Sequence, residues 1–168
     1  MAGAPQLKVF LAGRVAVQID GVRVEEERFP GRQGRLLFAY LVAEQGRAVP
    51  RDELAEALWG ERPPASWDKA LTVLASKLRG LLAEQGVDAP GALTAAFGCY
   101  RLDLPEGTWV DVIAAASSAQ QAEEALARGD LEDAKAAATW AVSLAQQPFL
   151  PGEDDGAWVG RKRRELVD

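Results

Sequence analysis

Few side chains in this sequence of 168 residues have the types and spacing that catalysis needs. The chain contains no histidine and a single cysteine, Cys99, which excludes Ser-His-Asp triads, His-activated cysteines and HExxH zinc sites. Phosphate-binding loops of the GxxxxGK[ST] or GxGxxG type are also missing from the sequence. Asp and Glu are plentiful, but no pair of them is set in a pocket by sequence alone. We therefore expect no catalytic residues, no metal site and no cofactor.

The densest group of hydrogen-bonding side chains lies on one face of a helix predicted from Ser66 to about Gln85. Ser66 is a good N-cap and Gly86 a good stop signal. Winding the helix at 100° per residue gives an apolar stripe of Trp67, Leu71, Leu74, Leu78, Leu81 and Leu82. The opposite face carries Asp68, Lys69, Thr72, Val73, Ser76, Lys77, Arg79 and Gly80.

The elements around this helix are predicted from periodicity and turn signals. Leu7 to Val24 alternates like β-strands, with a hairpin signal at Asp20-Gly21. Helical patterns run from Arg32 to Gln45 and from about Arg51 to Trp59, and two short strands follow at 92–96 and 99–104. An order of strands, three helices and a hairpin is the layout of a winged helix-turn-helix with an N-terminal sheet.

The remainder of the chain changes in composition and charge. Alanine fills 13 of the 32 positions from Ala114 to Ala145, and Gly129-Asp130 divides two predicted helices at 112–128 and 131–146. A third helix is expected at 157–167. Antiparallel helix pairs of this size are the unit of tetratricopeptide-like arrays, so either the natural chain continues past Asp168 or the pair packs on the first unit.

The acidity of the chain is concentrated in this second half. The net charge is −6, yet residues 1–105 carry 13 basic and 13 acidic side chains, whereas residues 106–168 carry 6 and 12. A pI near 4.8 is weak evidence against nucleic-acid binding, because DNA attracts a local positive surface. The argument applies fully only to the acidic second half of the chain. No apolar run is long enough to span a membrane and no secretory signal is visible, so we expect a cytoplasmic protein.

Several short motifs, taken in order, resemble the Streptomyces antibiotic regulatory protein (SARP) family of transcriptional activators. They are Gly31–Leu37, Val49–Leu54, Leu58–Gly60, Pro63–Ala65, Ala70–Val73, Ser76–Arg79 and Tyr100–Leu102. The helices after Asp111 and the Pro148–Gly152 stretch continue the resemblance. It implies a mostly α fold with small β-sheets: an OmpR-type winged-helix DNA-binding domain at 1–106, followed at 107–168 by the start of a tetratricopeptide-like bacterial transcriptional activator domain.

The resemblance also implies roles for individual residues. In OmpR-like domains the third helix enters the major groove, which places Val73 and Lys77 at base edges. The alternative for Val73 is a tolerated surface position. Phosphate or wing contacts fall to Lys69, Thr72, Ser76, Arg79 and Arg101. For Lys69 and Arg79 the alternative is a solvated charge, and for Arg101 it is cross-strand pairing on the wing.

Other polar and aromatic residues have plainer interpretations. Arg32 and Arg35 could touch the DNA backbone or pair with Glu25–Glu27. Cys99 and Tyr100 are expected to be core residues, and the Arg161–Arg164 run a solvated cluster at a helix end. The tryptophans are spread over different elements, which favours packing over a stacking platform; they are Trp59, Trp67, Trp109, Trp140 and Trp158.

The function implied is sequence-specific binding of double-stranded DNA by a transcriptional activator. RNA polymerase and a second copy on direct repeats are further candidate partners. Family members commonly have arginine where this chain has Lys77 and Gly80, which predicts weaker binding by one copy. The alternative function is a protein-interaction module of a larger regulator, in which the winged helix has lost most of its DNA affinity.

Overall fold

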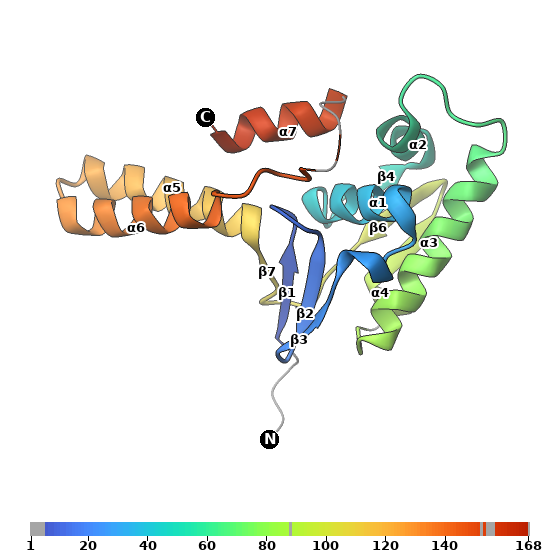
Figure 1. Ribbon diagram of the computed structural model, residues 1–168, viewed down its shortest axis with the longest axis horizontal. Coiled ribbons are helices and arrows are strands. Elements are labelled where there is room, and N and C mark those ends of the chain that lie inside the picture. Colours follow the sequence, from blue (N-terminus) through green and yellow to red (C-terminus); the bar gives the residue numbers. More distant parts are fainter. Residues whose placement is uncertain (1–5, 88, 152, 154–156, 168) are drawn as a thin grey trace. The chain divides into compact units, whose positions relative to one another are not determined.

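The computed structural model describes residues 6–87, 89–151, 153 and 157–167 (Figure 1). They divide into two compact units, one formed by residues 22–107 and the other by residues 1–21 together with 108–168. One boundary between the units lies near residue 107. Residues 1–21, however, group with the C-terminal residues, because a strand that follows the boundary pairs with the first strand of the chain.

The unit of residues 22–107 contains three main helices and a small sheet. β3 (Val22–Val24) and a 3-10 turn (Glu26–Arg28) precede α1 (Gly31–Ala43). β4 (Val49–Pro50), α2 (Arg51–Trp59) and α3 (Trp67–Glu84) follow, and then α4 (Ala89–Ala92), β5 (Leu93–Ala96) and β6 (Cys99–Leu102). The three predicted helices and the C-terminal hairpin are confirmed; the two-residue β4 and the one-turn α4 were not predicted.

The sheet of this unit has the strand order β4-β6-β5, and both pairs are antiparallel. Val49 pairs with Tyr100, and Leu93 pairs with Leu102. Phe97 and Gly98 join β5 to β6 with φ of 53° and 72°, which gives the tight turn of a wing. Leucines from α1, α2, α3 and both wing strands form the core; those at most 3% exposed include Leu37, Leu41, Leu54, Leu58, Leu71, Leu78, Leu82, Leu93 and Leu102.

Ser66 differs from its expected role at the start of α3. It occupies the N-cap position, but its side chain makes no capping hydrogen bond. Most N-cap residues have an extended backbone, which aims the side-chain oxygen at the free N–H groups of the first turn. Ser66 has a ψ of 24° and is not extended, so its side chain lacks this aim. The Ser66 carbonyl still accepts the first helical hydrogen bond, from the amide of Ala70 at 3.0 Å.

The other unit combines a sheet with a long helical hairpin. β1 (Leu7–Phe10) lies between β2 (Ala16–Ile19) and β7 (Trp109–Val110), antiparallel to the first and parallel to the second. Lys8 pairs with Trp109 across the parallel ladder. Asp20 and Gly21 follow β2 with φ of 49° and 84°, the two positive values of a type I′ turn, where the sequence predicted a hairpin.

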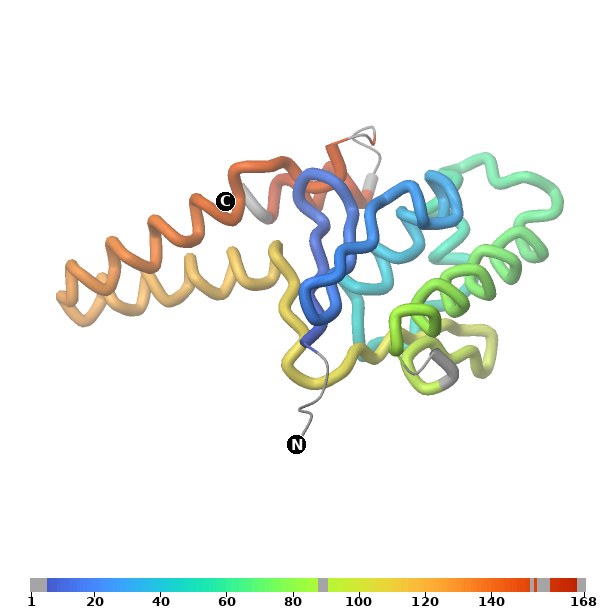
Figure 2. Tube along the Cα trace, turned by 60° about the horizontal axis from the view of Figure 1, so that its bottom comes forward, coloured from blue at the N-terminus to red at the C-terminus, as the bar shows by residue number. Residues whose placement is uncertain are grey.

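The helical hairpin consists of α5 (Asp111–Ala127) and α6 (Leu131–Leu144), which run side by side in Figures 1 and 2. Asp130 caps α6, because its carboxylate accepts from the amide of Asp133 at 3.1 Å. Beyond its first turn, the buried side chains of α5 are the small ones of Ala115, Ser118 and Ala125, so the helices can pack closely. The two predicted helices and the third one, α7 (Ala157–Val167), are confirmed.

Two expectations for this unit are wrong. Trp140 on α6 is 55% exposed, so the prediction that the tryptophans serve packing fails there. Arg163, expected in a solvated cluster, instead donates to the backbone carbonyls of Phe149 and Glu153, each at 2.8 Å, and to that of Leu150. Its long side chain reaches back from α7 to the connector before it, a contact that the local sequence does not show.

Candidate nucleic-acid interface

One side of α3 forms an exposed polar surface. It consists of Lys69, Thr72, Val73, Ser76 and Lys77, and we call it the α3 polar face. These positions are spaced i, i+3, i+4, i+7 and i+8, so they share one side of the helix. Leu71, Leu78 and Leu82 on the other side are buried, which fixes which side of α3 faces solvent. The predicted separation of the two faces is confirmed.

Val73, Lys77 and Lys69 are the residues of this face that could contact another molecule most freely. The Val73 side chain is 50% exposed, and it is the one apolar side chain of this face. Lys69 and Lys77 are exposed, and neither has an ion-pair partner within the described part of the chain. Both ammonium groups are therefore available to an anion or to a hydrogen-bond acceptor.

The Thr72 hydroxyl, in contrast, is already committed. It accepts a hydrogen bond from Nη2 of Arg51 at 2.8 Å and donates to the carbonyl of Asp68 at 3.1 Å. A hydroxyl has a single proton to donate, so Thr72 would have to break the bond to Asp68 to donate to a phosphate. In the structure, the hydroxyl proton of Thr72 is used within the domain and is not free for a ligand.

Arg51, the first residue of α2, joins three elements of the unit, and sequence reasoning missed it. Its Nε donates to Oδ1 of Asp68 and its Nη1 to the Tyr100 hydroxyl, both at 2.8 Å. The guanidinium also lies 5.2 Å from the centre of the Tyr100 ring, within the range of a cation–π contact. Arg51 thereby links the starts of α2 and α3 to strand β6 of the wing.

The hydrogen bonds of this cluster favour the charged form of Arg51. Burial alone would lower the pKa of Arg51, but hydrogen bonds to Asp68 and Tyr100 outweigh it and raise that pKa. The carboxylate of Asp68, which precedes Lys69, is balanced by the Arg51 guanidinium. Its pairing reduces the negative potential that the sequence places beside the α3 polar face.

Arg79 lies half-buried on α3 and also has an internal partner. Its Nε donates to the backbone carbonyl of Leu93 at 3.2 Å. The contact holds α3 against the first residue of β5, so Arg79 connects the helix to the wing. The prediction of a solvated charge does not describe this guanidinium.

The wing carries an arginine and an aromatic residue that are both exposed. Nε of Arg101 pairs with Oδ2 of Asp103 at 2.9 Å, so its partner is a neighbour along the chain and not the cross-strand residue expected as the alternative. Phe97 at the turn is fully exposed and has a positive φ of 53°, a conformation uncommon for a bulky residue. The sequence placed Phe97 at the turn but gave no sign of its exposure.

The remaining candidate residues take ordinary structural positions. Tyr100 is 3% exposed, which confirms it as a core residue, and Cys99 is half-buried in β6. Glu25 pairs with Arg23 at 2.8 Å. Among the described residues, no group of His, Cys, Asp and Glu side chains could hold a metal ion, and no helix could span a membrane.

Comparison with known proteins identifies the unit that carries the α3 polar face. The family model described as "Transcriptional regulatory protein, C terminal" matches residues 28–102. The regulatory protein AfsR of Streptomyces coelicolor is 36% identical over 121 residues, which cover 71% of this chain and 12% of AfsR. The regulatory protein DnrI of Streptomyces peucetius is 34% identical over 145 residues, 82% of this chain and 52% of DnrI.

A solved structure agrees with these relatives. Mycobacterium tuberculosis EmbR, in complex with a low-affinity phosphopeptide, matches 98% of this chain with a TM-score of 0.85 and 30% sequence identity. The match covers 42% of the EmbR chain, so this chain spans about half or less of the relatives that it resembles. Residues 28–102 therefore form a winged-helix domain of the kind found at the C-terminus of transcriptional regulatory proteins, and the chain is similar to the regulators AfsR, DnrI and EmbR, which are of the SARP type.

Proposed function

We propose that this chain binds double-stranded DNA in a sequence-specific manner through the α3 polar face and activates transcription. The observation that carries the proposal is the exposure of Val73 between two lysines that have no ion-pair partner among the described residues. An apolar side chain at this place is explained if it contacts an apolar group of the ligand. The major groove offers such a group in the thymine methyl.

Within this proposal, Val73 and Lys77 read bases. The Lys77 ammonium can donate to the O6 and N7 acceptors of guanine, and the Val73 methyls can pack against thymine. Lys69 and Ser76, exposed on the same face, contact the phosphates and fix the position of the helix. Thr72 and Arg79 support the helix through Arg51 and Leu93, so their proposed contribution to the DNA contact is indirect.

The wing supplies a second contact in the proposed complex. Arg101 would exchange its exposed partner Asp103 for a phosphate or the minor groove, because an exposed ion pair costs little to break. Phe97 would lie against the sugars or the bases of the minor groove, where other DNA-binding proteins place apolar side chains. Both contacts extend the interface beyond α3.

One copy of the chain presents few cations to DNA, so we expect its binding to be weak. Each phosphate contact contributes about 0.9 to the slope of log affinity against log salt concentration. Two copies on adjacent repeats would double the number of contacts, and the DNA would then carry a dimer. We further propose that the chain contacts RNA polymerase. We also propose that it acts in the cytoplasm, where it would meet DNA, and that it catalyses no reaction.

Fluorescence anisotropy with labelled duplexes tests the proposal. Promoter fragments from the chain's own locus and random duplexes of equal length are titrated at about 50 to 200 mM salt. The proposal predicts salt-sensitive binding with a preference for one fragment. Absence of binding at the lowest salt, by a chain that is folded by circular dichroism, would contradict it and favour an interaction module.

A further inference from the structure

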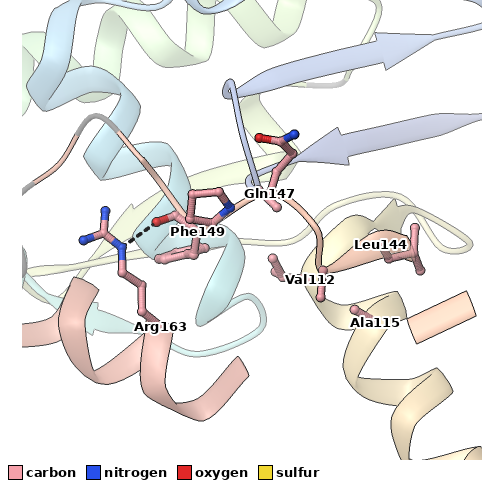
Figure 3. A pocket seen from close by; sticks show the side chains of 9 residues that line it. Val112, Ala115, Leu144, Gln147, Phe149 and Arg163 are labelled. Carbon is pink, nitrogen blue, oxygen red and sulfur yellow. Dashed lines mark hydrogen bonds between the residues drawn. The ribbon is translucent and has the colours of Figure 1, made fainter. Parts of the chain in front are cut away.

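The unit formed by residues 1–21 and 108–168 contains an apolar cavity that the DNA-binding proposal does not use (Figure 3). Its volume is about 240 Å³. The walls come from the start of α5, the end of α6, the connector that follows, and α7. Val112, Leu144 and Phe149 supply the large apolar side chains, and Ala12, Ala115 and Ala145 the small ones.

Hydrogen bonds hold the N-terminal wall of this cavity in place. The Asp111 carboxylate accepts from the amides of Leu11 and Ala12, each at 3.0 Å, and from the amide of Val112 at 2.8 Å. Asp111 is 5% exposed, so these bonds lie away from solvent. They attach the segment after β1 to the first turn of α5, and the cavity lies beside this junction.

The connector before α7 is fixed just as firmly. The amide of Gly13 donates to the carbonyl of Pro148 at 2.9 Å, and the amide of Leu150 donates to that of Leu11 at 3.1 Å. The Phe149 ring packs edge-on against Trp158, with 5.7 Å between ring centres. Because these contacts are internal to the unit, the cavity is formed before any ligand arrives.

The cavity remains open because three of its wall positions are alanine. Alanine has too short a side chain to fill the space that the fixed backbone leaves between Val112, Leu144 and Phe149. The Arg163 guanidinium at its edge donates to backbone carbonyls, including that of Phe149 at 2.8 Å, as Figure 3 shows. Its hydrogen bonds are directed at the connector, so the walls that remain for a ligand are almost entirely apolar.

These walls define the class of ligand. We propose that the cavity is a binding site for a neutral, largely apolar molecule of about one or two rings. An engineered apolar cavity of about 150 Å³ accepts benzene, so a pocket of about 240 Å³, here partly open to solvent, has room for a fused bicyclic compound. A charged ligand is disfavoured because moving an ion into apolar surroundings carries a large desolvation cost. None of the wall residues belongs to the α3 polar face.

Titration of the whole chain with 2-naphthol tests the proposal, since its fluorescence can be excited apart from that of tryptophan. We expect saturable binding of one molecule per chain and an increase in Tm with ligand concentration, because the ligand binds only the folded state. Ala115→Leu places a larger side chain in the cavity and should weaken binding by more than about tenfold. Ala116→Leu, on the exposed side of the same helix, is the matched control and should bind like the parent.

A second variant covers the case in which Ala115→Leu fails to fold. Ala145 also lines the cavity, at the exposed end of α6, so Ala145→Leu narrows the cavity from a second element. We expect the same loss of binding there, and weaker binding of the anion 2-naphthoate by the parent chain. Binding that does not saturate, or that persists unchanged in a folded Ala115→Leu or Ala145→Leu variant, would overturn the proposal.

Discussion

Nε of Arg51 donates to Oδ1 of Asp68 at 2.8 Å, and this bond joins the first turn of α2 to the first turn of α3. The same guanidinium reaches Thr72 and the Tyr100 hydroxyl. One side chain thus sets the position of the helix that carries Val73 and Lys77 relative to the wing. The relationship makes Arg51 a positioning residue for the proposed DNA contact.

Replacing Arg51 by alanine should therefore destabilise the winged helix. Hydrogen bonds to charged groups contribute about 1.5–3 kcal/mol each in mutational studies, but the Arg51–Asp68 pair is partly exposed, so we expect a total loss of about 1–3 kcal/mol. Urea denaturation followed by circular dichroism measures it. Arg62→Ala is the control, because Arg62 is an exposed arginine in the connector before α3. Equal free energies of unfolding for the two variants would show that Arg51 does not stabilise the domain.

Asp103→Asn should strengthen DNA binding. The substitution removes the carboxylate that pairs with Arg101 at 2.9 Å and leaves that guanidinium available to a phosphate. Arg101 would then contact its phosphate without first giving up an ion pair, so the affinity should rise by at most about 1 kcal/mol, the usual upper strength of an exposed pair. Anisotropy titrations of the single variant and of Asp103→Asn combined with Arg101→Ala separate this effect from the change in net charge. An equal gain in both variants would show that Arg101 does not contact DNA.

Asp111→Asn should destabilise the unit that contains the apolar cavity. The asparagine amide keeps one acceptor oxygen where the carboxylate has two, so at least one of the amides of Leu11, Ala12 and Val112 loses its partner. An unsatisfied buried donor costs about 1–3 kcal/mol. Thermal unfolding compares this variant with Glu123→Gln, which makes the same chemical change at an exposed position of α5. Equal Tm values for the two variants would contradict the role given to Asp111.

Tyr40 should make the stability of the winged helix sensitive to alkaline pH. Burial, and donation of its hydroxyl to Glu53 at 2.6 Å, raise the pKa of Tyr40 from 10.0 to about 12. Between these values the folded state holds the proton while the unfolded state has lost it, so the free energy of unfolding falls as the pH rises through the window.

Tyrosinate absorbance and urea denaturation, measured from pH 10.0 to about 12, test this dependence. Tyr40→Phe removes the ionisable hydroxyl, so the decline in stability should be smaller in that variant than in the parent. Tyr100 is the other tyrosine of the chain and gives the reference absorbance in the variant. Identical pH profiles of parent and Tyr40→Phe would contradict the assignment.

Much of the fold could be predicted because its elements have local signals. The period of leucines in α3, the glycine turns and the alanine-rich helices each follow from neighbouring residues. The same periodicity placed Val73 and Lys77 on the exposed face of α3 correctly. The short β4 and α4 were missed because two to four residues are too few to establish a period.

The contacts that assemble the site could not be predicted from the sequence. Arg51 meets Tyr100 across 49 positions, and Asp111 meets Leu11 across 100. Such pairs form only because the folded backbone brings together residues that are far apart in the sequence. Composition and local spacing do not predict which distant residues meet. For the same reason, the engagement of Thr72 and Arg79 and the pairing of β1 with β7 became visible only in the structure.

Paired anisotropy titrations of Lys77→Ala and Lys135→Ala test whether Lys77 on α3 reads a base. Lys135 is an exposed lysine on α6, so its substitution changes the net charge equally. We expect Lys77→Ala to cost about 1–3 kcal/mol on one preferred duplex and much less on random duplexes, and Lys135→Ala to leave both affinities unchanged. Affinities of Lys77→Ala that match those of Lys135→Ala on every duplex would contradict the base-reading role of Lys77.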